Sequence, residues 1–474
     1  MRFLDQGPDI PDDLLDARDE GQVIFFCGAG VSRAEAGGPS FRELADRVVA
    51  SLGSTKTSPA RQLLTISETI KSVPGVGGLP PADRIFAMLE QEFPVADVRR
   101  AVATALRPAE NAGLGPHKAL IDLSRTPDGT VRLVTTNFDR VFELADPKLV
   151  PIVPPVLPDP ARPEPLNGIV YLHGKVALDY SEPDSPEFVL SSADFGRAYL
   201  ADGWATEFMR ALIGRYRIIF VGYSADDPPM QYLLEALKPV VEPGQLYAFQ
   251  DGDESFASGL WRHKGVTAIP FGHFAALWQS LDAWAERARD PAAWRAGIAA
   301  MASANKPGNL LAYQRGQVAH LVSSKIGAGI FAGHSPAPSS EWLCVFDPLV
   351  RYDRCRGMSW DGSEQERFDP FENFGLDSDE TPERGKEERG TPTVPPGSWS
   401  ALDGMSGERL SDPGGVIFSL RGPSAQKPDR LSPRLWRLAR WIARVAGETT
   451  EPPRDCRRPF GLSYAAMGTS SSMA

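Results

Sequence analysis

Four groups of small or polar residues carry the side chains that could do chemistry in this chain. Each group follows a run of apolar residues: 28–32, Asn137 with Asp139, His173, and Ser224. An amide, a carboxylate and an imidazole that lie close together could orient an oxygen nucleophile and remove its proton. His173 is the candidate base, because an unperturbed histidine has a pKa of ~6.5. These residues predict an active site.

The first group is a glycine turn. Residues 23–27 are five consecutive apolar residues, a pattern typical of a strand buried on both faces of a parallel sheet. Residues 28–30 break this run, and we expect the chain to restart as a helix after residues 37–39. Small residues let the backbone approach a ligand, and a helix start offers free N–H groups to an anion. The turn predicts a phosphate or dinucleotide site. The third glycine of G-x-G-x-x-G is missing, so a tight turn without a ligand stays the alternative.

Buried strands alternating with helices would position these groups. Further strands are expected at residues 131–136, 169–172, 188–190, 217–221, 246–249 and 266–271, helices at 12–19, 41–52, 205–213 and 274–288, and a proline-rich loop at 151–165. A helical module is expected at about 53–128. The carboxyl ends of parallel strands line one crevice of an open sheet, so the polar groups should meet there. The sequence therefore predicts an α/β fold, a Rossmann-like parallel sheet with an inserted helical module.

Composition divides the chain further. We expect a lead-in at residues 1–20, a nucleotide-binding domain at 21–290, a connecting region at 291–359, a disordered, flexible linker at 360–415 and a C-terminal segment at 416–474. Residues 360–415 are rich in Pro, Gly, Ser and acids, which predicts the linker. A helix is expected at 309–323 and a strand at 342–347. The basic amphipathic helix at 434–445 is interpreted as a packing helix rather than a membrane or nucleic-acid face.

Charge and cysteine content argue against several classes of protein. The formal net charge of −11 disfavours direct nucleic-acid binding, which needs a basic face. The cysteines form no C-x-x-C pair, so neither a zinc ribbon nor a disulfide framework is expected. They are Cys27, Cys344, Cys355 and Cys456. The N-terminus lacks the apolar core of a signal peptide, and no run approaches the ~18 apolar residues of a membrane span. We expect a cytoplasmic protein that does not bind membranes.

Simpler roles stay open for several of these residues. Asn137 and Asp139 could cap the helix that follows them. His173 could be a hydrogen-bonded histidine in a turn, and Ser224 is as readily structural as a phosphate contact. Asp226 and Asp227 are interpreted as helix caps. The other histidines have no partner motif and are interpreted as structural or surface residues: His117, His263, His273, His320 and His334.

Taken together, the motifs resemble those of the sirtuin superfamily. Residues 28–32, Gly-Ala-Gly-Val-Ser, are similar to its G-A-G-x-S loop. Residues 37–42 are similar to G-I-P-D-F-R, with Ser40 in place of the acid and a spacer one residue longer. Thr-Thr-Asn-Phe-Asp at 135–139 is similar to T-Q-N-x-D, and Leu-His-Gly at 172–174 to the catalytic H-G; Gly-Tyr-Ser at 222–224 stands where sirtuins carry G-T-S. The resemblance covers about residues 20–290 and implies a sirtuin-like Rossmann domain that binds NAD.

The chain departs from the protein-deacylating sirtuins. It has no cysteine between Cys27 and Cys344, so it lacks their four-cysteine zinc ribbon and no zinc is expected. The Gly-Tyr-Ser-x-x-Asp-Pro stretch and the inserted helices resemble the bacterial anti-phage defence sirtuins. That resemblance implies an NAD glycohydrolase that depletes NAD in abortive infection, a homo-oligomer switched on by a phage-derived activator or a partner protein. The alternatives are an NAD-dependent protein deacylase and a non-catalytic NAD or ADP-ribose sensor.

The resemblance also implies roles for individual residues. Asn137 would orient the ribose and the attacking water, and His173 would act as the base. Asp139 would hold the nicotinamide carboxamide or support its loop. The residues implied in binding NAD, here a substrate, are Gly28, Ala29, Gly30, Ser32, Phe41, Arg42, Thr136, Gly222 and Ser224. No residue is expected to bind a metal.

Overall fold

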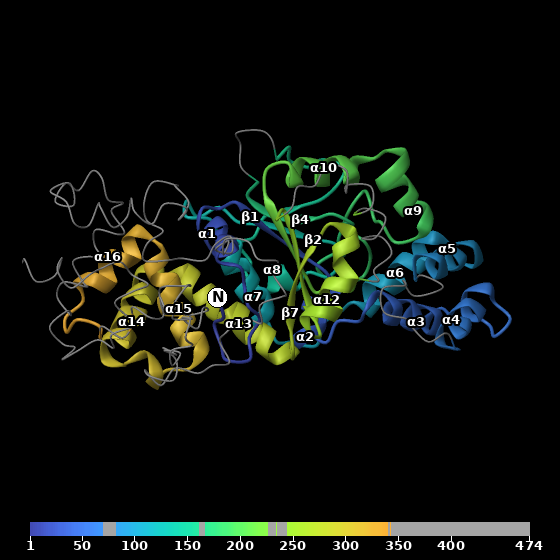
Figure 1. Ribbon diagram of the computed structural model, residues 1–474. Helices are drawn as coiled ribbons and strands as arrows, with labels where there is room; N and C mark the ends of the chain where they lie inside the picture. Colours follow the sequence, from blue (N-terminus) through green and yellow to red (C-terminus); the bar gives the residue numbers. More distant parts are fainter. Residues whose placement is uncertain (70–81, 161–165, 226–233, 235–243, 340–341, 343–474) are drawn as a thin grey trace, which may run out of the picture. The chain divides into compact units, whose positions relative to one another are not determined.

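The computed structural model describes residues 1–69, 82–160, 166–225, 234, 244–339 and 342 (Figure 1). The chain forms two compact units. One is Gln6–Arg289, and the other contains Met1–Asp5 and the chain from Asp290 onward. The first unit contains the sheet and all candidate site residues named above, so most of the argument concerns it.

The first unit is built on a parallel sheet. Its described residues form seven strands in the order β3-β4-β2-β1-β5-β6-β7, and every neighbouring pair is parallel. The strands are β1 Val23–Cys27, β2 Arg132–Thr135, β3 Pro151–Ile152, β4 Gly168–Tyr171, β5 Arg217–Val221, β6 Leu246–Asp251 and β7 Thr267–Phe271. The prediction of an α/β fold with a parallel sheet is therefore confirmed.

The strand order reverses at β1, which lies between β2 and β5. Phe26 pairs with Val134 on one side and with Phe220 on the other. Both faces of β1 are buried: Phe25 packs edge-on against Trp284, with ring centroids 5.6 Å apart, whereas Phe26 belongs to the apolar core on the other face. In an open parallel sheet, the point of reversal leaves a crevice at the carboxyl ends of the strands.

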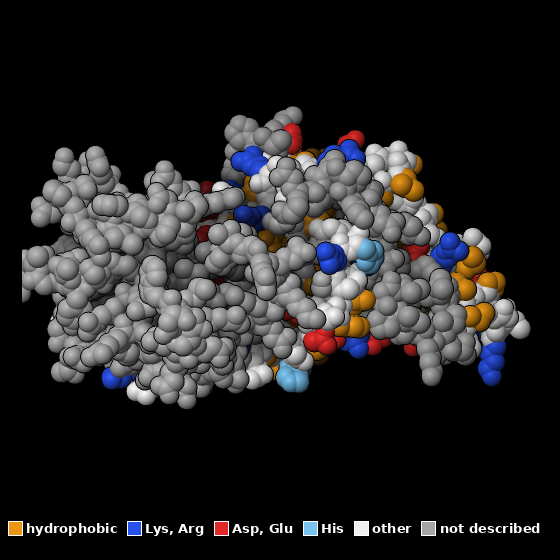
Figure 2. Space-filling model, viewed as in Figure 1, with side chains coloured by type: hydrophobic (Ala, Val, Ile, Leu, Met, Phe, Trp, Pro, Cys, Tyr) orange, Lys and Arg blue, Asp and Glu red, His pale blue; other side chains and the backbone are white. Residues whose placement is uncertain are grey.

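Helices surround this sheet and form the inserted module. Those of the first unit are α1 Asp12–Asp19, α2 Ala29–Glu35, α3 Phe41–Ser51, α4 Pro59–Thr69, α5 Ala82–Glu92, α6 Val95–Ala105, α7 Gly115–Leu123, α8 Val141–Ala145, α9 Ser192–Gly196, the π-helix η1 Arg197–Ala201, α10 Trp204–Ile213, α12 Glu254–Trp261, the 3-10 helix η3 Arg262–Lys264 and α13 Phe274–Arg289. Helices α3 to α6 share an apolar core that includes Val48, Phe86 and Val102. On the face shown in Figure 2, apolar and charged side chains of both signs are mixed over this module, at the right of the view.

The module begins at a capping box. The Ser40 hydroxyl accepts a hydrogen bond from the backbone N–H of Glu43 at 3.2 Å, and the Glu43 carboxylate accepts one from the backbone N–H of Ser40 at 2.8 Å. Two backbone donors that a helix start leaves unpaired are satisfied in this way. Ser40 thus fixes where α3 starts and so directs Phe41 toward the sheet edge.

Four local predictions were wrong. Helix α2 starts directly after Gly28, whereas the chain was expected to restart as a helix only after residues 37–39; Gly28 is extended and serves as the N-cap. Residues 188–190 are buried but form no strand: the Val189 N–H donates to the His173 carbonyl at 2.9 Å, and the Leu190 N–H donates to the Asp194 carboxylate at 3.2 Å. The loop at 151–165 contributes the edge strand β3, and Trp342 is helical rather than the start of a strand. The other strand and helix limits expected for the first unit agree to within two residues.

The described part of the second unit is helical. It contains α14 Pro291–Ala304, the 3-10 helix η4 Pro307–Asn309, α15 Ala312–Ser323 and α16 Lys325–Gly333. Its core includes Val318, Phe331 and Trp342, whose indole N–H donates to the Ala302 carbonyl at 3.0 Å. Asp226, Asp227, the linker at 360–415 and the helix at 434–445 lie outside the described residues. Of the helices that are described, none combines the length and apolarity needed to cross a bilayer.

Candidate active site

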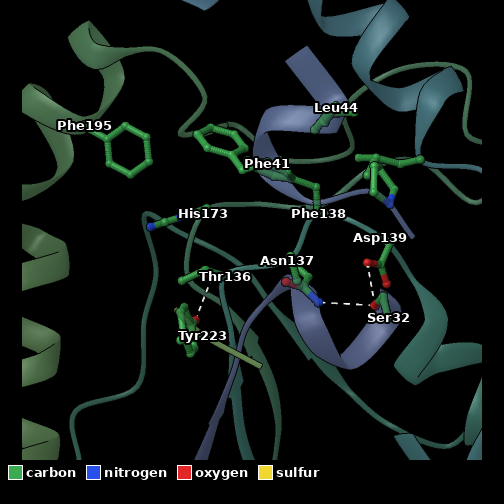
Figure 3. A pocket seen from close by; sticks show the side chains of 13 residues that line it. Ser32, Phe41, Leu44, Thr136, Asn137, Phe138, Asp139, His173, Phe195 and Tyr223 are labelled. Atoms are coloured by element: carbon green, nitrogen blue, oxygen red, sulfur yellow. Dashed lines mark hydrogen bonds between the residues drawn. The ribbon is translucent and has the colours of Figure 1, made fainter. Parts of the chain in front are cut away.

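A pocket lies at the carboxyl ends of the central strands (Figure 3). About 630 Å³ of space lies between its walls, part of it open solvent. Residues that follow β1, β2, β4 and β5 line it together with side chains of the helical module and α9. The lining residues are Ala29, Ser32, Pro39, Phe41, Leu44, Leu106, Thr136, Asn137, Phe138, Asp139, His173, Phe195 and Tyr223.

Most of the residues singled out in the sequence meet here. Three groups from different strands, Asn137 with Asp139, His173, and Ala29 with Ser32, line the same pocket. Thr136 and Phe41 line it as well. The remaining candidates are not among the lining residues: Gly28, Gly30, Arg42, Gly222 and Ser224.

The three glycines instead join two strand-end turns. The Gly28 N–H donates to the Val221 carbonyl and the Gly30 N–H to the Gly222 carbonyl, both at 2.9 Å. A Cβ on Gly30 would lie 2.7 Å from the Gly222 Cα, so only glycine fits this approach. Gly222 has φ +76°, which also favours glycine. These two amide protons are already used within the protein, and a ligand at this turn would have to contact other atoms, such as those of Ala29.

Arg42 and Ser224 lie on the surface. The exposed Arg42 guanidinium donates to the Ser67 carbonyl at 3.1 Å, and Ser224 is also exposed. Between Gly222 and Ser224, Tyr223 reaches the pocket, which sequence reasoning missed. The only signal in the sequence was an aromatic residue where the resembling motif has threonine.

Ser32 is the centre of a buried hydrogen-bond network. Its hydroxyl donates to Asp139 Oδ2 at 2.9 Å and accepts from Asn137 Nδ2 at 3.2 Å (Figure 3). His117 Nε2, on α7, lies 3.2 Å from the same oxygen. A hydroxyl has one proton and two lone pairs, so these contacts use its full capacity when Nε2 carries the imidazole proton. Ser32 is only 2% exposed. Its hydroxyl links Asp139, Asn137 and His117 to one another.

Asn137 and Asp139 differ in their local roles. Asn137 Nδ2 also donates to the Gly28 carbonyl at 3.2 Å, which ties the turn after β2 to the turn after β1. In Figure 3 its amide oxygen points away from Ser32, on the side of Thr136. Asp139 Oδ1 accepts from the Val141 N–H at the start of α8, at 3.1 Å. Asp139 therefore supports the first residue of α8, whose N-cap is Arg140, and it faces the pocket. Burial raises the pKa of its carboxyl.

The two buried histidines at this site, His173 and His117, are neutral at pH 7. Burial lowers the pKa of His173 from its ordinary value of 6.5 to about 3. It lowers the pKa of His117 to about 3 in the same way. The expectation that His173 keeps an unperturbed pKa is wrong, because the surrounding protein removes the water that would solvate an imidazolium. His173 Nε2 lies 2.7 Å from the Tyr199 hydroxyl, so it is hydrogen-bonded as well as pocket-lining.

An aromatic wall surrounds His173. Its ring is perpendicular to Phe195, at 88° with centroids 5.1 Å apart, and Phe138 lies 6.3 Å away. No Lys or Arg is among the lining residues that the structure describes. The pocket thus combines a flat apolar wall with one buried carboxyl, a chemistry that suits a planar and even cationic ring. Among the described residues, no three His, Cys, Asp or Glu side chains form a group that could hold a metal ion.

Residues 131–269 match the family model of the SIR2-like domain. The chain is also 31% identical over 310 residues to the uncharacterized protein y4cA of Sinorhizobium fredii. That match covers 61% of this chain and 25% of the other protein, so the chain spans about a quarter of the length of this relative.

The matched SIR2-like segment runs from β2 into β7 and includes Asn137, Asp139, His173 and Tyr223. Ser32 and His117 precede it in the chain and complete the hydrogen-bond network from outside the matched residues. The resemblance to the sirtuin superfamily is supported by this match. This match supports a sirtuin-type, NAD-related function.

Proposed function

We propose that the SIR2-like domain binds NAD in this pocket and hydrolyses the bond between nicotinamide and ribose, which yields nicotinamide and ADP-ribose. The observation that carries this proposal is the convergence of Asn137, Asp139 and His173 in one aromatic-walled pocket. These side chains come from the loops after two neighbouring strands, β2 and β4. The SIR2-like match supports the choice of NAD as the ligand.

The electrostatics of the pocket suit the nicotinamide end of NAD. The nicotinamide ring is planar and carries a positive charge while it is attached to ribose. Aromatic faces and a carboxylate attract such a ring, whereas Lys and Arg side chains would repel it. Phe41, Phe138 and Phe195 would supply the apolar wall, and Asp139 the negative charge.

The reaction itself needs little acid catalysis. When the bond between C1′ and the ring nitrogen breaks, both electrons go to that nitrogen, and nicotinamide leaves as a neutral molecule. Water adds to the cation-like C1′, and His173 takes the proton that this water loses before passing it to solvent. Burial lowers the pKa of His173, so its imidazole is unprotonated at neutral pH but is a weak base. A weak base suffices here, because water that has added to a cation-like carbon is strongly acidic. The Asn137 amide oxygen would orient the water.

A non-catalytic NAD or ADP-ribose sensor is the second candidate. It is favoured by the contacts that occupy the site in this state: Tyr199 is hydrogen-bonded to His173, and the Gly28 and Gly30 amides are bonded to β5 and its turn. Such a site could bind a nucleotide without turning it over. The biological setting that we propose, NAD depletion by a homo-oligomer in anti-phage defence after activation by a phage component or partner, is based on the resemblance of the motifs.

The decisive test is purified full-length protein incubated with NAD, with nicotinamide and ADP-ribose measured by chromatography. We expect release of both products by the wild type and loss of release in His173→Ala. His263→Ala is the matched control, because His263 is exposed on η3, outside the pocket. NAD binding without any product, unchanged in His173→Ala, would favour the sensor. Loss of acetyl from an added acetyl-lysine peptide would favour a deacylase.

A cellular experiment covers the case in which an activator is required. Bacteria that express the wild type, His173→Ala or His263→Ala are followed through a phage challenge while cellular NAD is measured. We expect NAD to collapse with the wild type and with His263→Ala only. Equal NAD in all three strains, together with inactive purified protein, would contradict the glycohydrolase proposal.

A further inference from the structure

The π-helix η1 brings a tyrosine to the candidate base. Tyr199 lies in η1, and its hydroxyl is 2.7 Å from His173 Nε2 although the two residues are 26 positions apart. π-helical turns are rare and occur frequently at functional sites. Within the part of the chain that the structure describes, Tyr199 is the side chain hydrogen-bonded to this imidazole.

The segment that carries Tyr199 is held firmly. Asp194 in α9 accepts hydrogen bonds from the backbone N–H groups of Leu190 and Ser191 at 3.2 and 3.0 Å, and Arg99 of α6 pairs with it at 3.3 Å. After η1, the Thr206 hydroxyl donates to the Tyr199 carbonyl at 2.9 Å. The backbone around Tyr199 is therefore anchored on both sides, as a positioning residue requires.

The rings are also packed. Tyr199 stacks on Phe195 at 23° with centroids 6.0 Å apart, and His173 is nearly perpendicular to both rings, at 88° to Phe195 and 81° to Tyr199. Replacement of Tyr199 by Phe would keep this packing and remove only the hydroxyl. The contribution of the hydrogen bond can thus be separated from that of the ring.

We propose that Tyr199 is a positioning residue for His173: its hydroxyl oxygen accepts the proton-bearing Nε2–H and so leaves the lone pair on Nδ1 to act as the base. The hydrogen bond made by one ring nitrogen decides which tautomer a histidine adopts. A base that is oriented by a third group is a general arrangement in catalytic sites. This role depends on the proposed function, in which water gives its proton to Nδ1 while Nε2 keeps its own proton.

The first test needs no turnover. The chain has six histidines, so the ring nitrogens of the full-length protein can be followed by NMR after labelling with nitrogen-15 histidine, and the signals lost in His173→Ala identify His173. We expect a neutral ring with the proton on Nε2 in the wild type. Tyr199→Phe should reduce the population of that tautomer. Identical His173 signals in the wild type and in Tyr199→Phe would overturn the proposal.

The second test uses NAD cleavage. We expect Tyr199→Phe to lower kcat roughly tenfold or more and to change KM by less than about twofold. Because Tyr199 acts through His173, the double variant with His173→Ala should be no slower than His173→Ala alone. Tyr247→Phe, which removes a hydroxyl from β6 outside the pocket, should keep the wild-type kcat.

The NMR test and the NAD cleavage test distinguish the positioning role of Tyr199 from the proposed hydrolysis of NAD. A wild-type kcat in Tyr199→Phe, or a further loss of rate in the double variant, would overturn the positioning role. If the wild type cleaves NAD neither as purified protein nor in challenged cells, but the NMR signals of His173 change in Tyr199→Phe, the hydrolase proposal fails and the hydrogen bond stands as a positioning contact.

Discussion

The hydroxyl of Tyr223 lies 2.7 Å from the hydroxyl of Thr136, and it also donates to the Cys27 carbonyl at 3.0 Å. One side chain from the turn after β5 therefore joins the ends of β1 and β2. Its ring atoms lie 2.9 Å from the position that a Cβ on Gly28 would take. The tyrosine covers this side of the glycine turn, so the turn, the two strand ends and the pocket wall form one packed unit.

Tyr223→Phe tests how much these two hydrogen bonds of the Tyr223 hydroxyl contribute to stability. The variant keeps the ring in the pocket but removes a hydroxyl that makes two hydrogen bonds, so we expect a loss of about 1–2 kcal/mol in the free energy of unfolding. Urea unfolding of the variant and the wild type measures the difference. An unchanged urea midpoint would mean that the hydroxyl contributes nothing to the stability of the fold.

Gly222→Ala tests the close approach of the two turns. A Cβ at Gly222 would lie 2.6 Å from the Val31 nitrogen, and the residue has φ +76°. We expect a loss of roughly 3 kcal/mol or more from clash and backbone strain together. Gly259→Ala is the control, because Gly259 is in α12 with open space around it, and it should be neutral or slightly stabilising. Equal melting temperatures for the two variants would refute the close-packing argument.

Ser32→Ala distinguishes a network residue from a ligand contact. Removal of the hydroxyl leaves Asp139 Oδ2, Asn137 Nδ2 and His117 Nε2 without this buried partner, so we expect a loss of about 2–4 kcal/mol in stability without any ligand present. The exposed Ser51 at the end of α3 provides the control Ser51→Ala, which should change stability little. Wild-type stability in Ser32→Ala would show that the network is energetically unimportant.

The pH dependence of turnover follows from the burial of His173. Its pKa is lowered to about 3, so the fraction of neutral imidazole is nearly constant from pH 5.5 to 8. We expect kcat for NAD cleavage to vary less than about threefold over that range, because protonation of the base does not limit the rate there. An acid limb centred near pH 6.5 would instead show that His173 is solvated in the working state.

The pH dependence of stability has a definite sign at the same residue. Between pH 3 and 6.5, His173 binds more protons in the unfolded chain than in the folded one, so the free energy of unfolding falls as the pH falls through this window. Asp139 has the opposite dependence, since burial raises its pKa and the folded chain holds that proton to higher pH.

Comparison with His173→Phe isolates the contribution of the histidine to this pH dependence. We expect the variant to be less acid-sensitive by up to ~1.4 kcal/mol per pH unit, measured by urea unfolding at pH 5 and 7. Equal slopes for the two proteins would argue against a buried neutral histidine.

Local patterns in the sequence were sufficient to predict six of the seven described strands; β3 was missed, and the strand expected at 188–190 does not form. Strand β5 was expected at its observed limits, because the apolar run at 218–221 directly follows Arg217 and ends at Gly222. The convergence of Asn137 and His173 in one pocket could also be predicted, since each follows a parallel strand and such strands end at the same edge. These predictions needed only the order of the elements.

Contacts between distant residues could not be predicted in the same way. His117 contacts Ser32, which stands 85 positions earlier in the chain. The residues next to His117 in the sequence contain no motif that indicates this contact. Tyr199 contacts His173 from the π-helix η1, a rare geometry that local sequence patterns do not predict. The lowered pKa of His173 likewise arises from side chains of several elements that together exclude water. The sequence analysis recognised Gly28 and Gly30, but it did not predict that they pack against the turn at Gly222.

The contact between the two glycine turns has a consequence for protein engineering. Gly28 and Gly30 belong to one end of the domain sequence and Gly222 to the other, yet each occupies space that a side chain on its partner would need. A loop graft that exchanged the first turn for one with larger residues would fail unless the second turn were exchanged with it. Recombination of this domain with related domains should therefore keep both turns from the same parent, wherever the crossover points between them are chosen.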